Sequence, residues 1–421
     1  MFSNKKYTTT LTIILTIILT LILVSILGFS VWDTFKPPVI DYINDDQVPL
    51  HMQKNKTSEN SNAEISTSSQ ASQIPKITNV KMNTLFLGEV FWGRYIDDWS
   101  KLSPLKYDYP FSGLNTLERE KYDAWIADME CPITSTYIDS ATQDDTLAFS
   151  CPSEYTAGAS KWFNAFTLAN NHTDNMEQVG GLGQTRDNLE KNKIQYFGHF
   201  DNAVEKDICE IISLPARTLD ENNKEVEIQF PIALCGYHNV FKLPTESQVA
   251  IISQYAKYFP TIVMPHQGKE YTYQADGLQE DFAHQYIDQG ADAVVGTHVH
   301  SIQNTEVYKD KLIVYSLGNF IFDQQASSQV RRGFALNLDF NYKFDANLQK
   351  FIDLGSECQK FQDNCLQKAI TNNLKKPTFT INYDAIPLDN SNKLAKKASP
   401  DVASEILTKI NWQQTVEKLK K

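Results

Sequence analysis

From Lys76 onward the chain consists of short apolar runs that alternate with segments of helical periodicity. Such an alternation is typical of an α/β fold, in which strands build a sheet and helices cover it. The 421 residues, of which 42% are hydrophobic, suffice for one large domain or two ordinary domains with a substantial core. The sequence contains no internal repeat, so we do not expect a repeat architecture.

Individual elements are predicted from apolar periodicity and from turn residues. Strands are expected within residues 83–90, 122–132, 163–172, 195–200, 228–238, 260–268, 291–300, 331–340 and 378–386. Helices are expected within residues 180–194 and 278–290, and a surface helix at 402–421. Lys309 and Asp310 separate two strand-like runs and predict the turn of a β-hairpin.

The N-terminal region contains no charged residue between Lys6 and Asp33, and its apolar run is long enough to cross a bilayer as a helix. Lysines precede the run and aspartates follow it. The positive-inside rule therefore predicts a single-pass protein of the cell membrane, with a cytoplasmic N-terminus and an extracytoplasmic main domain. A cleaved signal peptide is the alternative, because it also has an apolar core behind basic residues.

Four segments are expected along the chain. Residues 1–32 form the cytoplasmic N-terminus and the membrane anchor, 33–75 a flexible stalk, 76–390 the α/β domain and 391–421 the C-terminal helix. The stalk is rich in Ser, Asn, Thr and Gln and poor in aromatic residues, so it cannot bury enough surface to offset the entropy lost on ordering.

Charge and cysteine content limit the partners and the compartment. The net charge of −12 argues against a basic surface that binds nucleic acid. Six cysteines in an extracytoplasmic domain are compatible with disulfides, and buried free thiols are the alternative. Cys358 and Cys365 are close enough in sequence for a local bridge, whereas the other four cysteines can pair in three ways.

Polar side chains follow several of the predicted strands at the point where each strand ends. The stretch "GTHVHS" places His298 and His300 two residues apart after an apolar run, so in an extended chain both would face the same side. The carboxyl ends of strands in an open α/β sheet meet at one edge, where ligands bind. The residues expected to converge at this edge are Glu89, Glu130, Asn171, His266, His298 and His300.

Carboxylate, imidazole and amide oxygen together suit a divalent ion such as zinc, manganese or iron(II). Two such ions that share one carboxylate would bind a phosphate oxyanion and lower the pKa of a water molecule. Each residue also has a structural alternative. His266 could be a hydrogen-bonded core residue, and the asparagines of "LANNHT" could serve turn geometry alone.

The order of the motifs "GEVFWGR", "ADMECPIT", "LANNHTDNMEQVGGLGQTRDNL", "PHQGKEY" and "DQGADAVVGTHVHSIQNTEVYKDKLIVYSLGNFIFDQ" resembles the capsule synthesis CapA family, also called PgsA-type poly-gamma-glutamate synthesis proteins. That family is similar to calcineurin-like metallophosphoesterases. The resemblance covers roughly residues 80–330. It implies a four-layer α-β-β-α sandwich of the metallophosphoesterase type, here preceded by one transmembrane helix, and one or two divalent ions (Mn, Zn or Fe).

The resemblance also assigns roles to the metal-ligating residues. Glu89 and His300 would hold one ion and Asn171, His266 and His298 the other, with Glu130 as the bridge. The sequence departs from the metallophosphoesterase pattern at Phe91, where an apolar ring replaces a ligand. A site with one ion, or with none, is therefore an alternative to the binuclear site.

Further residues near the motifs have expected roles in catalysis and substrate binding. His172 would stabilise a leaving oxygen, and Asp174 would orient His172 or cap the following helix. Arg94, Glu270 and Asn319 are expected to bind substrate, Arg94 through forked hydrogen bonds to phosphate or carboxylate.

The resemblance implies a membrane-anchored protein that acts in the assembly, export or attachment of a capsule polymer such as poly-gamma-glutamate. Its expected partners are the membrane, the acidic polymer and membrane-embedded capsule synthesis subunits. Nucleic acid is not an expected partner. Two alternatives remain: a metal-dependent envelope hydrolase that cleaves phosphoesters or amides, and a non-catalytic polymer-binding scaffold with a degenerate site.

Overall fold

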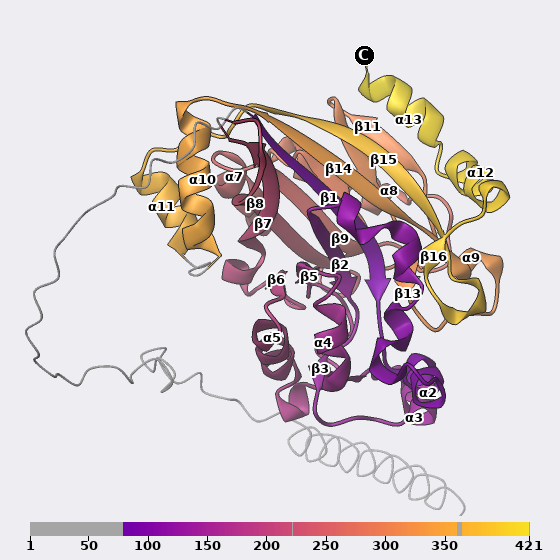
Figure 1. Cartoon of the computed structure of the whole chain (residues 1–421). Coiled ribbons are helices and arrows are strands. Elements are labelled where there is room, and N and C mark those ends of the chain that lie inside the picture. The colour runs from indigo at the N-terminus through magenta and orange to yellow at the C-terminus, as the bar shows by residue number, and fades with distance from the viewer. Residues whose placement is uncertain (1–78, 221, 360–363, 421) are drawn as a thin grey trace, which may run out of the picture. The chain divides into compact units, whose positions relative to one another are not determined.

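A 14-stranded sheet organises the fold, which is mixed α/β (Figure 1). The computed structural model describes residues 79–220, 222–359 and 364–420. The predicted transmembrane helix at 1–32 and the stalk at 33–75 lie outside these residues. Among the helices that are described, none combines the length and the apolar character needed to cross a bilayer.

The strands have the following bounds: β1 (Asn79–Val90), β2 (Ala124–Met129), β3 (Ile133–Thr134), β4 (Cys151–Pro152), β5 (Ala165–Thr167), β6 (Gln195–Phe197), β7 (Cys209–Leu219), β8 (Glu225–Asn239), β9 (Thr261–Gln267), β10 (Ala293–Val295), β11 (Thr305–Tyr308), β12 (Lys311–Val314), β13 (Asn319–Ile321), β14 (Arg332–Lys343), β15 (Phe379–Asp389) and β16 (Lys396–Lys397). All but β3 and β4, which pair with each other, belong to the large sheet.

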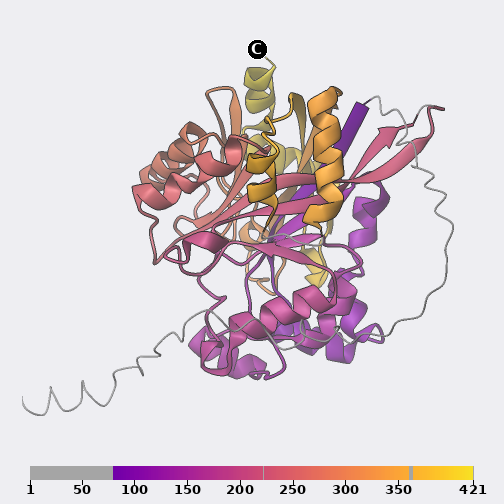
Figure 2. The same ribbon diagram turned by 90° about the vertical axis from the view of Figure 1, so that its left-hand side faces the viewer.

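The α-helices have the following bounds: α2 (Arg94–Leu102), α3 (Ser140–Thr146), α4 (Thr156–Ala159), α5 (Gly181–Lys191), α6 (Glu246–Val249), α7 (Ile251–Ala256), α8 (Gly277–Asp288), α9 (Ser328–Arg331), α10 (Ala346–Cys358), α11 (Cys365–Thr371), α12 (Pro400–Lys409) and α13 (Trp412–Leu419). Helices α2 to α5 gather on one part of the sheet, apart from α10 and α11 (Figure 2).

Strand β1 is the point at which the sheet branches. Along one edge it pairs first with β14 and then with β13, and along the other edge first with β7 and then with β2. Strands β5 and β6 continue the arm that begins at β2, whereas β8, β9, β10, β12 and β11 continue the arm that begins at β7. The carboxyl end of β1 therefore lies between the two arms, with the parallel strands β2, β5 and β6 in one arm and the parallel strands β8, β9, β10 and β12 in the other.

Three apolar cores account for the burial of both faces of the sheet. Even-numbered residues of β1, such as Met82 and Phe86, pack with side chains of β7 to β10, β12 and β14. Odd-numbered residues, such as Leu85 and Leu87, pack with α2, α4 and α5. A third core lies between the outer faces of β8 to β10 and helices α7 and α8. This alternation within one strand is the period of two that a sheet covered on both sides requires.

The texture of each strand matches its environment. Strand β9 is buried at every residue, as its continuous apolar run and its parallel neighbours on both sides require. Strands β14 and β15 pair antiparallel. Part of β14 alternates buried and half-buried residues, and the first half of β15 alternates half-buried and exposed residues. The predicted hairpin is confirmed, with Lys309 and Asp310 at φ 49° and 60° in the left-handed region that a two-residue turn needs.

All six cysteines are paired in three disulfides. Cys358 and Cys365 form the predicted local bridge. Of the three pairings open to the remaining cysteines, the structure has Cys131–Cys151 and Cys209–Cys235. The alternative of buried free thiols is therefore wrong.

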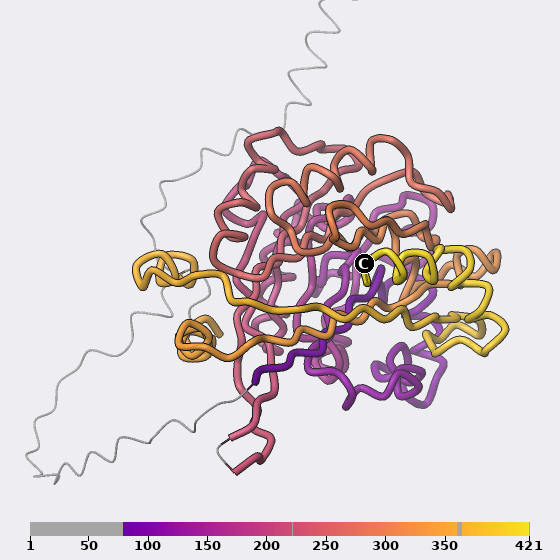
Figure 3. Tube along the Cα trace, turned by 90° about the horizontal axis from the view of Figure 1, so that it is seen from above, coloured from indigo at the N-terminus to yellow at the C-terminus, as the bar shows by residue number. Residues whose placement is uncertain are grey.

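The C-terminal segment differs from the predicted surface helix. It forms two helices, α12 and α13, which meet at Asn411 in a left-handed conformation with φ 58°. Both lie beside strands of the large sheet (Figure 3). Ile406, Ile410 and Trp412 are buried in the first core, so this segment completes the fold. The large sheet also continues beyond the expected boundary at residue 390, because β16 (Lys396–Lys397) pairs with β15.

A substitution at Gly88 tests how closely the backbone of β1 approaches that of Gly318. A Cβ atom at this position would lie 1.8 Å from the carbonyl oxygen of Gly318, and the backbone of that residue cannot move aside cheaply. We expect Gly88→Ala to lower the free energy of unfolding by about 1–3 kcal/mol or more, as overpacking does elsewhere. Urea denaturation of the compact unit Gln73–Lys421 measures this change.

Gly183 supplies the matched control. It lies inside α5, and a Cβ atom there would meet no atom within 4 Å. Gly183→Ala should leave stability unchanged or raise it by about 0.5–1 kcal/mol, because Ala is the better helix former. Equal stability of the two variants would contradict the close approach of β1 and β13.

Candidate metal centre

The ends of several strands bring polar side chains to one buried place. Glu89 lies near the end of β1, Glu130 directly after β2, and His266 near the end of β9. His298 and His300 follow β10, and each of these five residues is at most 4% exposed. Asn171, which follows β5, is half-buried and its Oδ1 lies 2.6 Å from Nε2 of His266. The six residues predicted as metal ligands therefore lie together.

The reason for the convergence of His298 and His300 differs from the predicted one. Strand β10 ends at Val295, and both histidines have left-handed backbones, with φ 92° and 56°. The two imidazoles are thus presented by a loop and not by the pleat of an extended strand. Gly296 begins this loop, where a Cβ atom would lie 2.1 Å from the carbonyl oxygen of Tyr315. The backbone N–H of His298 donates to Oε1 of Glu89 at 2.5 Å.

Glu130 lies at the centre of the cluster. Its Oε1 is 3.8 Å from Nε2 of His172, 3.8 Å from Nε2 of His266 and 3.7 Å from Nε2 of His300. Within the described residues, neither oxygen of this carboxylate has a hydrogen-bond partner. The ligand atoms of Glu130, His266 and His298 also lie within 4.8 Å of one another.

Hydrogen bonds at the far side of three rings orient their Nε2 atoms toward Glu130. Nδ1 of His266 lies 2.7 Å from Oδ2 of Asp128, and Nδ1 of His300 lies 2.9 Å from Oδ1 of Asn319. These oxygen atoms accept a hydrogen bond, so Nδ1 carries the proton and Nε2 presents a lone pair. The same holds for His172.

Asn175 supplies the corresponding oxygen for His172. Its Oδ1 accepts from the backbone N–H of Phe149 at 2.8 Å, which identifies this atom as the oxygen, and lies 2.9 Å from Nδ1 of His172. Asp174, expected to orient His172, instead contacts the amide of Asn175 at 3.5 Å. The orienting residue is therefore the next one along the chain.

Asp128 is a residue of the site that we did not predict. Its Oδ2 accepts from the hydroxyl of Thr297 at 2.7 Å in addition to His266, and its Oδ1 accepts from Nδ2 of Asn170 at 2.9 Å. The carboxylate therefore fixes the ring of His266 and ties the ends of β2 and β9 together. A signal was present in the sequence, since Asp128 lies two residues before Glu130 and so on the same face of the strand.

Burial changes the protonation of the carboxyl groups. Desolvation, with a smaller contribution from the charge of Asp128, raises the pKa of Glu89 from 4.5 to about 8. Desolvation also raises the pKa of Asp128 to about 6 and that of Glu130 well above 4.5. Without a cation, this cluster therefore holds protons that carboxylates at the surface would lose.

Burial acts on the imidazoles in the opposite direction. Desolvation lowers the pKa of His172 to about 4, those of His266 and His298 well below 6.5, and that of His300 in the same direction. All four rings are neutral near pH 7, which is the form that binds metals. Neutral imidazoles around Glu130, a buried carboxylate without a hydrogen-bond partner among the described residues, fit a divalent cation such as zinc, manganese or iron(II).

The residues predicted to bind substrate have other contacts. Arg94 forms a forked pair with Asp323, at 2.8 Å and 2.6 Å. Asn319 orients His300, as described above, and donates to the carbonyl oxygen of Val330 at 3.0 Å. Glu270 is half-buried on the loop after β9, and its charge raises the pKa of Glu89 and Glu130.

Phe91 occupies an apolar wall of the site. It is fully buried, and its ring centroid lies 4.9 Å from that of Phe149 and 5.0 Å from that of Phe322. The guanidinium of Arg94 lies 5.2 Å from the Phe91 ring. Phe149 and Phe322 in turn contact the rings of His172 and His300, so this wall borders the cluster around Glu130.

Comparison with known proteins gives matches that cover much of the described chain. A family model described as "Bacterial capsule synthesis protein PGA_cap" matches residues 83–220 and 235–324, more than half of the 421 residues. The capsule biosynthesis protein CapA of Bacillus anthracis is 27% identical over 270 residues, which cover 58% of this chain and 61% of that protein. The PGA biosynthesis protein CapA of Bacillus subtilis (strain 168) is 40% identical over 85 residues, which cover 20% of this chain and 22% of that protein.

The chain thus matches less than two thirds of the length of either curated relative. Among solved structures, TT1561 of Thermus thermophilus is 11% identical, with a TM-score of 0.30, and the match covers 60% of this chain and 93% of that one. A likeness this low carries no argument.

Asp128→Asn tests how the ring of His266 is held. Both oxygens of Asp128 accept hydrogen bonds, so an amide must turn its NH₂ group toward another donor. We expect metal affinity to fall about 10- to 100-fold, as it does when a ligating histidine loses its orienting partner. Equilibrium dialysis with Mn²⁺ measures the change. Asp292→Asn, at a buried aspartate that accepts from Thr261 at the other end of β9, should leave affinity unchanged.

The pH dependence of stability tests the buried carboxyl groups. The pKa of Glu89 is raised from 4.5 to about 8 in the folded chain, so between these values the folded chain holds a proton that the unfolded chain releases. Glu89 therefore lowers the free energy of unfolding of the metal-free chain as pH rises toward 8. The buried histidines act in the opposite direction, because they take up protons only on unfolding. Glu89→Gln keeps these histidines, so the difference between wild type and variant isolates Glu89.

Thermal unfolding of Gln73–Lys421 with a chelator measures this difference. We expect the stability of the wild type, relative to Glu89→Gln, to fall between pH 6.5 and pH 8. Metal binding needs ionised carboxylates, so added Mn²⁺ should raise the melting temperature of the wild type more at pH 8 than at pH 6.5. An equal rise at both pH values would show that the carboxyl groups do not bind the ion.

Proposed function

The chain belongs to the bacterial capsule synthesis family described as PGA_cap, and from this membership we propose that it acts in capsule production through a divalent-metal site. The relatives it matches are named for capsule biosynthesis and for PGA biosynthesis. We propose that the polymer is acidic, of the poly-gamma-glutamate kind, and that the protein acts in its assembly, export or attachment.

The surroundings of Glu130 carry the metal part of this proposal. A buried carboxylate with no hydrogen-bond partner among the described residues lies within 3.8 Å of three imidazole Nε2 atoms. Burial of such a group is costly unless a proton or a cation compensates it. Three lone pairs aimed at the same oxygen favour a cation as the natural partner.

In this proposal Glu130, His266 and His298 hold the ion, joined by Glu89, Asn171 and His300 according to the number of ions bound. A bound divalent cation would supply Lewis-acid catalysis, that is, stabilisation of negative charge on a phosphoryl or amide oxygen. Asp128 and Asn319 keep the rings of His266 and His300 in place. The apolar wall that includes Phe91 limits the access of water.

The arrangement of the three cores supports a sandwich of the metallophosphoesterase type, with helices outside two layers of strands. We propose that this domain lies outside the cytoplasm and is held to the cell membrane by the apolar N-terminal run. Three disulfides support an oxidising compartment. In this setting the membrane and membrane-embedded synthesis subunits are its partners.

The charge of the protein bears on how it would handle such a polymer. A net charge of −12 repels a polyanion over a Debye length, about 10 Å at 0.1 M salt. Contact with an acidic polymer therefore needs a local positive charge. A divalent ion at Glu130 would supply that charge where the imidazoles converge.

A non-catalytic scaffold is the second candidate, and Phe91 favours it. The buried ring removes one ligand from the pattern that binuclear metallophosphoesterases use, and its ring neighbours Phe149 and Phe322 are apolar as well. A site with fewer ligands binds one ion more readily than two. One ion suffices to bind a polyanion without cleaving it.

Glu130→Gln tests the proposal. The amide keeps the shape of the side chain but loses the charge, so we expect the variant to bind no divalent ion where the wild-type unit Gln73–Lys421 binds at least one. Metal content is measured by elemental analysis. Glu225→Gln, an exposed residue at the start of β8, should retain the wild-type metal content.

The same two variants, introduced into cells that lack the wild-type protein, test the biological role. Full-length Glu225→Gln should restore acidic polymer at the cell surface, and Glu130→Gln should not. Hydrolysis of a phosphoester or of an amide-linked acidic polymer by the metal-loaded unit distinguishes the hydrolase from the scaffold. A wild-type unit without metal, together with full activity of Glu130→Gln in cells, would contradict the proposed site.

A further inference from the structure

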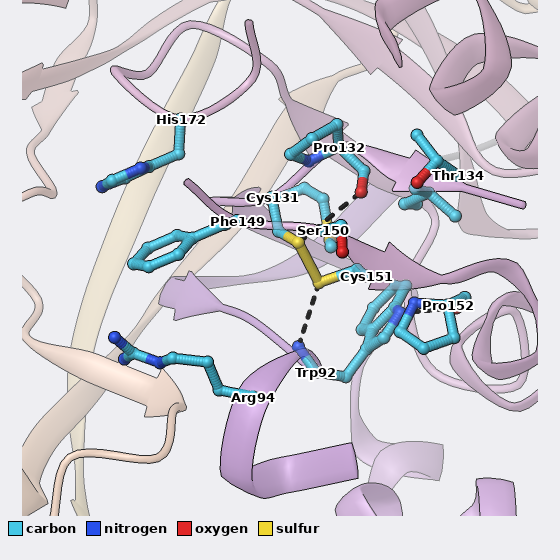
Figure 4. The surroundings of a disulfide bond; sticks show 12 residues. Trp92, Arg94, Cys131, Pro132, Thr134, Phe149, Ser150, Cys151, Pro152 and His172 are labelled. Carbon is cyan, nitrogen blue, oxygen red and sulfur yellow. Dashed lines mark hydrogen bonds between the residues drawn. A yellow bond between two sulfur atoms is a disulfide. The ribbon is translucent and has the colours of Figure 1, made fainter. Parts of the chain in front are cut away.

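The disulfide between Cys131 and Cys151 lies in the same region as Phe149 and His172 (Figure 4). Cys131 directly follows Glu130 in the sequence, so one end of the bridge is the next residue after the one that carries the central carboxylate. The other end lies in β4, which pairs with β3, and the backbone N–H of Cys151 donates to the carbonyl oxygen of Pro132 at 2.9 Å. The bridge therefore joins the segment that carries Glu130 to residues 149–152.

The segment after β1 contacts the same bridge. The backbone N–H of Trp92 donates to Sγ of Cys151 at 3.4 Å, and its indole N–H donates to the carbonyl oxygen of Pro152 at 3.0 Å. Trp92 is three residues beyond Glu89. The chain segments of both buried glutamates thus converge on the sulfur atoms.

Phe149, two residues before Cys151, extends this connection to His172. The two rings stack with centroids 3.9 Å apart and an angle of 22°. On the other side of Phe149 lies the guanidinium of Arg94, 4.7 Å from the ring centroid (Figure 4). The phenyl ring is held between a cation and an imidazole, and it is 4% exposed.

Asn175 makes a second connection between Phe149 and His172. Its Oδ1 accepts from the backbone N–H of Phe149 and contacts Nδ1 of His172, at 2.8 Å and 2.9 Å. Nε2 of His172 then faces Oε1 of Glu130 at 3.8 Å. Cys131, at one end of the disulfide, is therefore next to Glu130 in the chain. Cys151, at the other end, is connected through Phe149 to the imidazole of His172, which faces Glu130.

We propose that the Cys131–Cys151 disulfide is a positioning device of the metal centre, which holds His172 against Glu130 by way of Phe149 and Asn175. The inference about metal affinity rests on the proposed function. The inference about the position of His172 rests on the geometry alone. Without the bridge, the covalent tie between residues 149–152 and the segment after β2 is lost. Only non-covalent contacts such as the β3–β4 hydrogen bond then join the two, so the stacked ring is held less firmly.

The other disulfides provide the contrast that the test needs. Cys209–Cys235 joins β7 to β8 and lies in the third core. Its sequence separation of 26 is close to the 20 of Cys131–Cys151, so loss of either bridge relaxes the unfolded chain to a similar extent. Cys131 directly follows Glu130, whereas neither Cys209 nor Cys235 is next in sequence to a residue of the candidate site.

The full-length chain in detergent is compared as wild type, C131A/C151A and C209A/C235A. Acylation of His172 by diethyl pyrocarbonate is followed by peptide mass spectrometry, with the more exposed His284 as the internal reference. We expect the His172 rate, relative to His284, to rise at least fivefold in C131A/C151A and to stay at the wild-type value in C209A/C235A. Mn²⁺ affinity should fall about tenfold or more in the first variant only.

Single substitutions test the path without loss of the bridge. Phe149→Ala and Asn175→Ala should each raise the His172 rate as C131A/C151A does. Asn175→Asp keeps an oxygen that can accept from both N–H groups and should restore the wild-type rate. Circular dichroism at the assay temperature verifies that each variant is folded.

The outcomes separate this inference from the proposed function. A wild-type chain that binds no Mn²⁺ contradicts the proposed function, and the acylation rates still decide the position of His172. Equal His172 rates in C131A/C151A and C209A/C235A overturn the positioning role, and so do wild-type rates in both alanine variants. Mn²⁺ affinity that is lowered equally by both cysteine pairs shows a general loss of rigidity and overturns it as well.

Discussion

The carboxylate of Glu130 imposes a condition that the rest of the site meets. It is fully buried, and no described side chain or backbone group donates a hydrogen bond to it. Such a group is costly to bury, because it loses its hydration and gains no partner. The surroundings offer imidazole nitrogens at 3.7–3.8 Å, too far for a direct hydrogen bond but suited to a shared cation. A cation bound at this place would therefore act on stability through one side chain.

That condition explains why a second layer of polar residues surrounds the ligands. A ring is held with the lone pair of one nitrogen toward the centre when its other N–H donates to an oxygen. Asp128, Asn319 and Asn175 supply these oxygens to His266, His300 and His172. The three come from β2, from β13 and from the loop after β5. The fold thus has to align separate elements before the site exists.

The branching of the sheet at β1 makes this alignment possible. The strand contacts β14 and β7 in its first half and β13 and β2 in its second, so its end meets the ends of both arms. Close backbone contact at Gly88 and Gly318 brings β13 near enough for Asn319 to reach His300. The Cys131–Cys151 bridge ties the next segment to the same place. The close packing at Gly88 and the positions of the site residues therefore both follow from the branching of the sheet at β1.

Which residues lie together in the candidate site could largely be predicted from the sequence, because they stand at or just after apolar runs that end at the same edge of the sheet. Glu89, Glu130, His266, His298 and His300 were found in this way, and the family resemblance rests on the same motifs. Asp128 shares a strand face with Glu130 and was open to the same reasoning. Asn175 and Phe149 carry no such signal, since their roles depend on contacts between segments distant in the chain.

The amino-acid order by itself determined which side chains end the strands, where the hairpin turns and which cysteines form the local bridge, because these depend on periodicity and on neighbours within a few residues. Only the tertiary structure decided the two longer disulfides, the left-handed loop that presents His298 and His300, and the pairing of Arg94 with Asp323. These features depend on which backbones approach each other across the sheet, and residues close in space but far apart along the chain leave no local pattern.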